Sequence, residues 1–419
     1  MASELSIFLD AAFCLSGKQI SELYERLLGK KVRFVSDGEE AEVVMKRSLE
    51  SSAVFSVESI EPLVLSADDE NGAFQGLMYA VRSLRLGKKC ERGSKIPKIS
   101  ERIIMLDIGR KYFTPNFLRR LLEEMALFGC NYLQLHFSED TGLGIESKKY
   151  PELNSKKTLS QKEVRKLIEY AAALSIEIIP DLDTPGHMTH ILKEHPEWRL
   201  KELTSQGETS VSSALDVTNE EAVAFIFSLY QEYMALFAGC RYFHIGADEF
   251  ADFDHFQRYP ALADQGQEKF EEYVNSVAAL VRQAGFIPRV WNDAFFRKNR
   301  TSTLSKELEI TYWTRWQKEM APVQTFLNEG YSVINFNDNY LYYVLGENAG
   351  YSYPTAQKIK EEWQPDLFAS EQRVQTDHQG QIKGAALAIW CDKPKAKEEE
   401  MIFLEIVKLM AAFSEHFYQ

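Results

Sequence analysis

The sequence predicts a (β/α)8 barrel, an α/β fold, preceded by a small α+β domain. From Ile103 onward, short apolar runs alternate with longer segments of helical period, and eight such runs can be counted. That alternation is typical of parallel strands joined by crossover helices, and eight repeats can close a barrel. Each expected strand is followed by a loop and then a helix, and the strands are Ile103–Ile108, Tyr132–His136, Glu177–Asp181, Tyr242–Gly246, Pro288–Asn292, Glu309–Trp313, Ser332–Phe336 and Ala385–Trp390.

The first connecting helix has clear start and stop signals. Thr114 and Pro115 supply an N-cap and a first-turn proline for a helix over Asn116–Leu127, and Gly129 follows where the helix should end. Ser160 is expected to begin the next helix with a capping box. These signals support the assignment of crossover helices between the strands.

Residues 1–98 follow a different pattern, in which short strand-like runs are separated by two amphipathic helices. This mixture predicts a small α+β domain, and a polar, glycine-containing linker at residues 87–94 leads from it to the first barrel strand. We therefore divide the chain into a small N-terminal domain, residues 1–98, and a (β/α)8 barrel, residues 99–419. The expected elements of the small domain are the strands Ser6–Leu9, Val32–Val35, Val43–Met45 and Leu63–Ser66 and the helices Gly17–Leu28 and Gly72–Leu86.

The composition is that of an ordinary globular protein. Hydrophobic residues make up 45% of the chain and aromatic residues 12%, which excludes a disordered or collagen-like chain. The net charge of −14 and the isoelectric point near 5.2 disfavour a nucleic-acid partner, because a phosphate backbone is bound by clustered lysines and arginines.

The sequence also predicts where the protein is found. No apolar run reaches the roughly 18 residues that span a bilayer, and Met1–Ser16 lacks the basic start and apolar stretch of an export signal. The five cysteines are scattered and show no metal-ligand spacing. We expect them to be reduced and buried, in a cytoplasmic protein with no membrane partner.

The strongest chemical signal is a pair of adjacent acids, Asp248 and Glu249, which follow the apolar strand Tyr242–Gly246. Barrel enzymes keep their chemistry at the carboxyl ends of the strands. Two neighbouring carboxyls perturb each other, so that one can stay neutral as a proton donor while the other stays ionised. The pair therefore predicts general acid catalysis, although a solvated strand end would look the same in isolation.

Polar and aromatic residues gather at the other strand ends as well. Several tryptophans, a tyrosine, an arginine and carboxylates around one barrel mouth indicate a sugar site, because pyranoses offer apolar faces for stacking and hydroxyls for hydrogen bonds. The segments concerned are Asp107–Arg110, His136–Asp140, Asp181–His187, Trp291–Asp293, Trp313, Asn337–Tyr340 and Trp390–Asp392.

Other chemistries have weaker support. His136, Glu139, Asp183 and His187 could together hold a divalent metal, but His-x-x-Glu is a weak metal spacing. The chain carries no glycine-rich phosphate loop and no Gly-x-Ser-x-Gly elbow. We expect neither a metal nor an organic cofactor.

The ordered motifs resemble those of glycoside hydrolase family 20, the exo-acting β-N-acetylhexosaminidases, along essentially the whole chain. The motifs are Asp107-x-x-Arg110, Asp183-x-Pro185-Gly186-His187, His244-x-Gly246-Ala247-Asp248-Glu249, Tyr340 and Trp390-x-Asp392. The resemblance implies a barrel that removes a terminal N-acetylhexosamine from an oligosaccharide or glycoconjugate. It also implies substrate-assisted retention, in which the acetamido group of the sugar is the nucleophile.

The resemblance assigns roles to individual residues. Glu249 would protonate the leaving oxygen and then activate water, Asp248 would accept the acetamido N–H, and Tyr340 would donate its hydroxyl to the acetamido oxygen. Arg110 and Asp392 would bind hydroxyls at the closed end of the pocket.

Further residues would complete the pocket. Trp390 would form its floor, and Trp291 and Trp313 would enclose the acetamido methyl. His187, Asp183 and His136 would lie behind these groups and steady them, His187 against a catalytic carboxylate.

Two positions depart from the usual family pattern: Asp392 stands where a glutamate is common and is one methylene shorter, and Tyr342 stands where an aspartate is common. The preference between N-acetylglucosamine and N-acetylgalactosamine stays open. A non-catalytic carbohydrate-binding barrel and a disaccharide-releasing barrel glycosidase are the alternatives, and the presence of both Asp248 and Glu249 weighs against the first. A homodimer is also left open, in which a partner would complete the loops near Trp316 and Tyr351.

Overall fold

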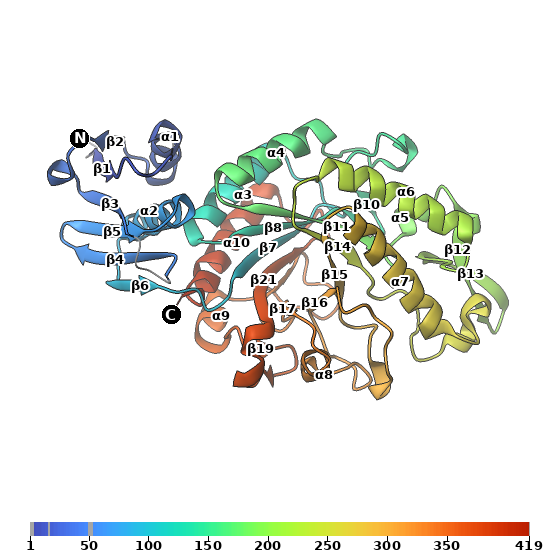
Figure 1. Ribbon diagram of the computed structural model, residues 1–419. Coiled ribbons are helices and arrows are strands. Elements are labelled where there is room, and N and C mark those ends of the chain that lie inside the picture. Colours follow the sequence, from blue (N-terminus) through green and yellow to red (C-terminus); the bar gives the residue numbers. More distant parts are fainter. Residues whose placement is uncertain (1–3, 16, 49–52, 419) are drawn as a thin grey trace.

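The computed structural model describes residues 4–15, 17–48 and 53–418, and a closed parallel barrel lies at its centre (Figure 1). Its strands hydrogen-bond in sequence order, and the pairing of β17 with β21 closes the ring. The predicted (β/α)8 barrel is therefore confirmed. Its strands are β7 (Glu101–Asp107), β8 (Tyr132–His136), β11 (Glu177–Thr184), β14 (Tyr242–Gly246), β15 (Ile287–Trp291), β16 (Glu309–Tyr312), β17 (Val333–Asn335) and β21 (Ile382–Trp390).

Helices surround this ring, and the two predicted helix starts are confirmed. Thr114 Oγ1 accepts the backbone N–H of Phe117 at 3.2 Å, and Gly129 ends the same helix at φ 76°. Ser160 forms the expected capping box. The helices are α3 (Pro115–Phe128), α4 (Gln161–Ala173), α6 (Glu220–Leu236), α7 (Gly266–Gln283), α8 (Val323–Asn328), α9 (Ala356–Glu362) and α10 (Glu399–Ser414).

The prediction that a helix follows every strand is wrong between β15 and β16. The structure describes every residue there and shows only a single 3-10 turn, Arg297–Asn299. Consecutive buried residues, Ala294 to Phe296, precede a polar stretch with no apolar period, so this segment has no face that a helix could bury. Phe296 and Lys298 have φ near 54°, which no α-helix allows.

The loops at the carboxyl ends of the barrel strands contain further short strands and one short helix. A strand that the sequence did not predict, β18 (Tyr342–Val344), pairs with β21 just outside the ring. The remaining short elements are β9 (Ser138–Glu139), β10 (Gly142–Leu143), α5 (Thr189–Leu192), the hairpin β12 (Arg199–Thr204) and β13 (Gly207–Leu215), and the pair β19 (Leu367–Phe368) and β20 (Gln372–Arg373).

The small N-terminal domain is a six-stranded sheet in the order β2-β1-β3-β5-β4-β6, with two helices. Strands β4 and β6 were not predicted, and β6 begins inside the segment that we expected to be a linker, where it pairs with β4. In β4, the buried Phe55 and Val57 alternate with Ser56 and Glu58, which was a visible strand signal. The elements are β1 (Leu5–Leu9), α1 (Gly17–Leu28), β2 (Val32–Val35), β3 (Val43–Arg47), β4 (Phe55–Ile60), β5 (Leu63–Ala67), α2 (Glu70–Arg85) and β6 (Gly93–Lys95).

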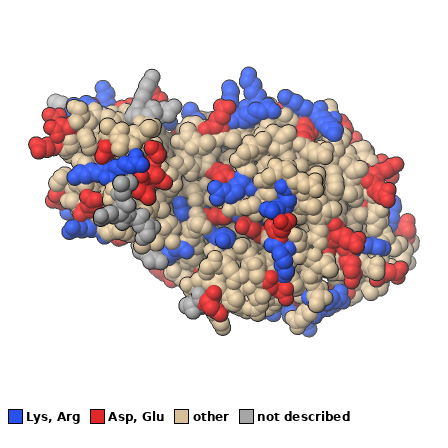
Figure 2. Space-filling model, viewed as in Figure 1, with Lys and Arg blue, Asp and Glu red and all other residues tan. Residues whose placement is uncertain are grey.

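The small domain packs against the barrel through α2, which lies beside α3 and α10 (Figure 1). Arg85 forms an ion pair with Glu124 of α3 at 2.7 Å, and Arg82 donates to Ser414 of α10. Basic and acidic side chains are interspersed on the face shown in Figure 2. No helix in the described ranges is long and apolar enough to cross a membrane. The five cysteines are free thiols, and four of them are buried as predicted, but the expectation was wrong for Cys14, which is exposed.

A buried ion network fills the amino end of the barrel. The Arg289 guanidinium contacts Glu101 Oε2 at 2.7 Å and Glu309 Oε2 at 2.6 Å, and its central carbon lies 3.5 Å from the ring centroid of Tyr242. Tyr242 also donates to Glu101. Ion pairs and a hydrogen bond therefore stabilise the amino end of the barrel, opposite the carboxyl end where the active site is expected.

We predict that Arg289→Met lowers the free energy of unfolding by about 3–5 kcal/mol, because it leaves two buried carboxylates without their cation. Urea unfolding followed by tryptophan fluorescence measures the change. The matched control is the triple variant Glu101→Gln, Arg289→Met and Glu309→Gln, which should recover much of the loss. Equal stability of Arg289→Met and the wild type would contradict this account.

Candidate active site

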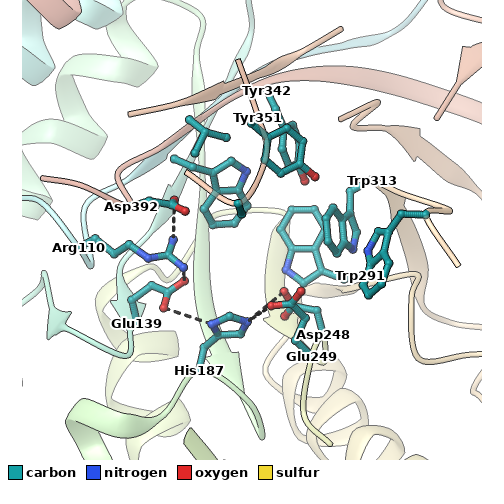
Figure 3. Close-up of a pocket in the computed structure, with 14 residues that line it drawn as sticks. Arg110, Glu139, His187, Asp248, Glu249, Trp291, Trp313, Tyr342, Tyr351 and Asp392 are labelled. Atoms are coloured by element: carbon teal, nitrogen blue, oxygen red, sulfur yellow. Dashed lines mark ion pairs between the residues drawn. The ribbon is translucent and has the colours of Figure 1, made fainter. Parts of the chain in front are cut away.

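A cavity of about 460 Å³ opens at the carboxyl ends of the barrel strands (Figure 3). Its walls come from the ends of β7, β8, β11, β14, β15, β16 and β21 and from the segment that carries β18, so that residues far apart in sequence meet. No lining residue comes from the described part of the small domain. The lining residues are Arg110, Glu139, His187, Asp248, Glu249, Trp291, Trp313, Trp316, Tyr342, Val344, Ala349, Tyr351, Trp390 and Asp392.

The two acids follow a sharp turn at the end of β14. Gly246 has φ 75°, and a Cβ on it would lie 1.7 Å from Asp183 Oδ1, so only glycine fits. Glu249 also has a left-handed backbone, with φ 43°. The turn gives the acids different surroundings: the Asp248 side chain is 11% exposed and that of Glu249 is 49% exposed. One carboxyl is therefore buried while the other reaches the mouth of the cavity.

His187 lies between the acids and a third carboxylate (Figure 3). Its Nδ1 is 3.3 Å from Glu139 Oε2, and its Nε2 is 3.5 Å from Asp248 Oδ2 and 3.4 Å from Glu249 Oε2. Burial alone would lower the pKa of His187, but Glu139 and Asp248 raise it well above its usual value. His187 is thus an imidazolium at neutral pH, and despite burial its charge lowers the pKa of Asp248.

A second layer of charges lies beneath this group. His136 contacts Asp181 at 2.9 Å through Nδ1 and Glu139 at 3.3 Å through Nε2, and its ring packs edge-on against Trp390. Burial and the nearby Asp248 raise the pKa of Asp183 well above its usual value. Asp183 therefore stays neutral where Asp248 is ionised, and the buried pair carries one negative charge.

Aromatic rings form the opposite wall. The rings of Trp313 and Tyr342 are parallel within 1°, with centroids 6.0 Å apart, and Trp390 lies 6.0 Å from Trp291 and 5.9 Å from Tyr342. Asp293 links the aromatic wall to the acid pair. It accepts hydrogen bonds from Trp313 Nε1–H at 3.1 Å and from the backbone N–H of Glu249 at 3.2 Å. Four aromatic rings thus surround a space bordered by carboxylates.

The far end of the cavity is rigid and charged. Arg110 pairs with Glu139 at 2.5 Å and with Asp107 at 3.0 Å, and its Nη1 is 3.9 Å from Asp392. The guanidinium also lies over the Trp390 ring at 5.5 Å. Asp392 accepts a further hydrogen bond from Asn348. This end can bind hydroxyl groups with donors and acceptors that are already oriented.

Most of the predicted site residues meet here, with one correction. The structure does not bring Tyr340 into the cavity: its hydroxyl donates to Glu371 at 3.0 Å, and its ring packs under Lys358. Tyr342 lines the cavity instead, because β18 begins there and pairs Tyr342 with Ala388 of β21, two residues before Trp390. Tyr340 lies in the turn before this strand. The strand-forming run Tyr342 to Val344 was the signal that could have identified the right tyrosine.

Other residues of the site had no assigned role. Glu139 had been named only within a strand-end segment and as a possible metal ligand, and Trp316 and Tyr351 had not been expected to line the cavity. Asp293, which lies behind the cavity wall, had no role either. Two groups of side chains have metal-ligand spacing, Glu139–Asp140–His187 and Asp183–His187–Asp248. Both groups share His187, and the expectation of a site without a metal stays a prediction.

The comparisons with known proteins agree with this geometry. The catalytic-domain model of glycosyl hydrolase family 20 matches residues 100–415. A lacto-N-biosidase of Bifidobacterium bifidum is 26% identical over 82% of this chain and 31% of its own length. The β subunit of Entamoeba histolytica β-hexosaminidase is 24% identical over 85% of this chain and 67% of its own. The chain thus spans about a third of the first relative and two thirds of the second.

Solved structures show the same fold. A β-N-acetylhexosaminidase from Bacteroides fragilis superposes with a TM-score of 0.75 at 19% identity, over 100% of this chain and 87% of its own. A catalytic module of the pneumococcal exo-β-D-N-acetylglucosaminidase superposes with a TM-score of 0.63 at 28% identity, over 76% and 83%. The family resemblance predicted from the motifs is confirmed: the chain belongs to glycosyl hydrolase family 20.

Proposed function

We propose that this protein is an exo-acting, retaining β-N-acetylhexosaminidase that removes a terminal β-linked N-acetylglucosamine or N-acetylgalactosamine. One observation carries the proposal: the buried Asp248 and the exposed Glu249 face a tryptophan-lined cavity whose other end carries Arg110 and Asp392. Charged groups that bind the far hydroxyls of a sugar at that end would favour removal of single terminal sugars, because those hydroxyls are free only on a terminal sugar. The family relatives support the reaction class.

The first chemical step uses the sugar's own acetamido group. Its carbonyl oxygen attacks the anomeric carbon, the bond from that carbon to the leaving oxygen breaks, and Glu249 gives its proton to that oxygen. The product is a cyclic oxazolinium ion. Asp248 is suited to accept the acetamido N–H, because its Oδ1 is buried and accepts no hydrogen bond from an N–H in the described residues. Its charge stabilises the positive charge that develops.

The second step reverses the first with water. Water adds to the anomeric carbon, its proton passes to Glu249, and the ring opens to release the sugar with its configuration retained. His187 holds both acids, since one imidazole nitrogen faces Asp248 and Glu249 while the other faces Glu139. The same proton donor therefore stays in place for both steps.

Tyr342 takes the role that we had expected for Tyr340. Its hydroxyl is buried and donates to no group in the part of the chain that the structure describes. A buried donor without an acceptor is costly, and the acetamido oxygen of a bound sugar would satisfy it. Trp313, parallel to the Tyr342 ring, would enclose the acetamido methyl.

Release of a disaccharide is the second candidate. It is favoured by the lacto-N-biosidase relative, which matches 82% of this chain, and by Asp392, whose shorter side chain approaches Arg110 only to 3.9 Å. A longer gap between Arg110 and Asp392 would leave room for a second sugar ring at this end of the cavity. The substrate assay below includes a disaccharide glycoside for this reason.

We predict that wild-type enzyme hydrolyses p-nitrophenyl β-N-acetylglucosaminide or its galacto epimer, and that Glu249→Gln and Asp248→Asn each lower kcat/KM by about 10²-fold or more. Tight inhibition by N-acetylglucosamine thiazoline, which mimics the oxazolinium ion, should accompany turnover. Faster cleavage of p-nitrophenyl β-lacto-N-bioside than of either monosaccharide substrate would favour the second candidate. Wild-type inactivity in a folded sample that still binds N-acetylglucosamine would indicate a binding barrel.

The two tyrosines provide a matched pair of variants. Tyr342→Phe should lower kcat by about 10²-fold, because it removes a donor to the acetamido oxygen, while Tyr340→Phe should leave kcat near the wild-type value. Steady-state kinetics on the same substrate measure both. A loss confined to Tyr340→Phe would reverse the assignment made from the structure.

Asp293 gives a pH-dependent prediction. Burial, followed by repulsion from Asp248, raises its pKa to about 7, whereas an unfolded Asp titrates near 4. Between these values the folded protein holds a proton that the unfolded chain has lost, so stability falls as pH rises, by up to about 1.4 kcal/mol per pH unit. Asp293→Asn removes this slope.

The difference in unfolding free energy between Asp293→Asn and wild type should therefore grow in favour of the variant from pH 4 to 7 and level off above 7. Any hydrogen bond to Asp293 that the substitution weakens changes the unfolding free energy by the same amount at every pH, so it does not alter the slope against pH. Urea unfolding at each pH measures it, and parallel curves for the two proteins would contradict the raised pKa.

A further inference from the structure

Trp316 is exposed to an unusual degree for its size. Its surface is 59% exposed, the largest fraction among the large hydrophobic residues of the described chain. It also lines the rim of the catalytic cavity, unlike the exposed Met401 and Leu404 of α10. An exposed aromatic ring beside a binding cavity marks a contact surface, since a flat indole face gains most when another apolar face covers it.

The loop that carries Trp316 is held in place on both sides. Thr314 Oγ1 donates to Asp338 at 2.8 Å, and Ser370 donates to the Arg315 carbonyl at 3.0 Å. On the other side, Arg297 donates to Gln317 Oε1 at 2.6 Å. The indole is therefore presented by an ordered loop, and a ligand that contacts it would not have to order the loop first.

The position of Trp316 relates it to one end of the substrate. Trp313, three residues earlier, forms the wall opposite the Arg110–Asp392 end (Figure 3). In the proposed binding mode the terminal sugar directs its far hydroxyls toward Arg110, so its leaving group would project from the cavity on the side where Glu249 is half exposed. Trp316 lines the same cavity and is itself exposed, as a contact for a group that projects into solvent has to be.

We propose that Trp316 is a specificity-determining residue that stacks on the first sugar ring of the leaving group, so that the enzyme prefers oligosaccharides to substrates with small leaving groups. This inference rests on the proposed function. A pyranose fits the contact because its axial C–H face is apolar and flat, and a neutral sugar suits a rim that offers an uncharged ring.

The test compares ligands that do and do not reach the rim. Trp316→Ala should raise KM for chitobiose and chitotriose by about 3–10-fold with little change in kcat. Inhibition by N-acetylglucosamine thiazoline, which fills only the terminal-sugar pocket, should be unchanged. Trp316→Phe should recover part of the affinity, because it keeps an aromatic face. Leu404→Ala, which removes an exposed apolar side chain from α10, is the matched control and should behave as wild type.

Equal KM values for chitobiose in wild type and Trp316→Ala would overturn the proposal, as would an equal loss of thiazoline affinity. Conversion of a wild-type dimer to a monomer by Trp316→Ala would also overturn it, because the indole would then be covered by a second copy of the chain. Failure of the proposed function is a separate result: wild type would cleave no substrate at all. Binding of chitotriose to Glu249→Gln, with and without Trp316→Ala, then measures the contact without turnover.

Discussion

The active site depends on the position of His187 between carboxylates. The ion pairs form a continuous chain across the cavity, from Asp392 through Arg110, Glu139 and His187 to Asp248 and Glu249 (Figure 3). Charges alternate along this chain, so each buried group has an opposite neighbour and none is left uncompensated. In the proposed mechanism, this series of ion pairs would join the residues that bind the far hydroxyls to those that move the proton, and a sugar held at one end would be aligned with the acids at the other.

Two further buried acids, Asp183 and Asp293, do not disturb this balance of charges because both are held neutral. Burial and the nearby Asp248 keep protons on Asp183, and on Asp293 below about pH 7. Were both ionised, Asp183 and Asp293 would add two negative charges to those of Glu139 and Asp248 around one imidazolium, His187. Their neutral forms let Asp248 alone carry the charge that an oxazolinium ion requires, while Asp293 still accepts the hydrogen bonds that orient Glu249 and Trp313. Burial thus selects which carboxylate is ionised.

The barrel could be predicted from sequence because its strands are buried on both faces and appear as short apolar runs. Residues directly after a strand, such as Asp248, Glu249 and Arg110, could be placed at the cavity for the same reason. The sequence did not predict elements that form only through tertiary contacts. Strand β18 forms because it pairs with the edge of β21, and this pairing places Tyr342, in place of the expected Tyr340, in the cavity wall. The neutral state of Asp293 and the exposure of Trp316 depend on neighbours from other loops, which no local pattern records.

The two ends of the cavity use different physical means of recognition. At the closed end, Arg110 is fixed by two carboxylates at 3.0 Å or less, and directional hydrogen bonds of this kind reject a sugar whose hydroxyl points the wrong way. At the open end, an exposed indole offers stacking, which tolerates many partners because it requires only a flat apolar face. Under the proposed function, such an enzyme would be strict about the sugar that it removes and would accept many different leaving groups. The proposed combination would suit repeated removal of terminal sugars from oligosaccharides, since each cycle would present a new leaving group to the same rim.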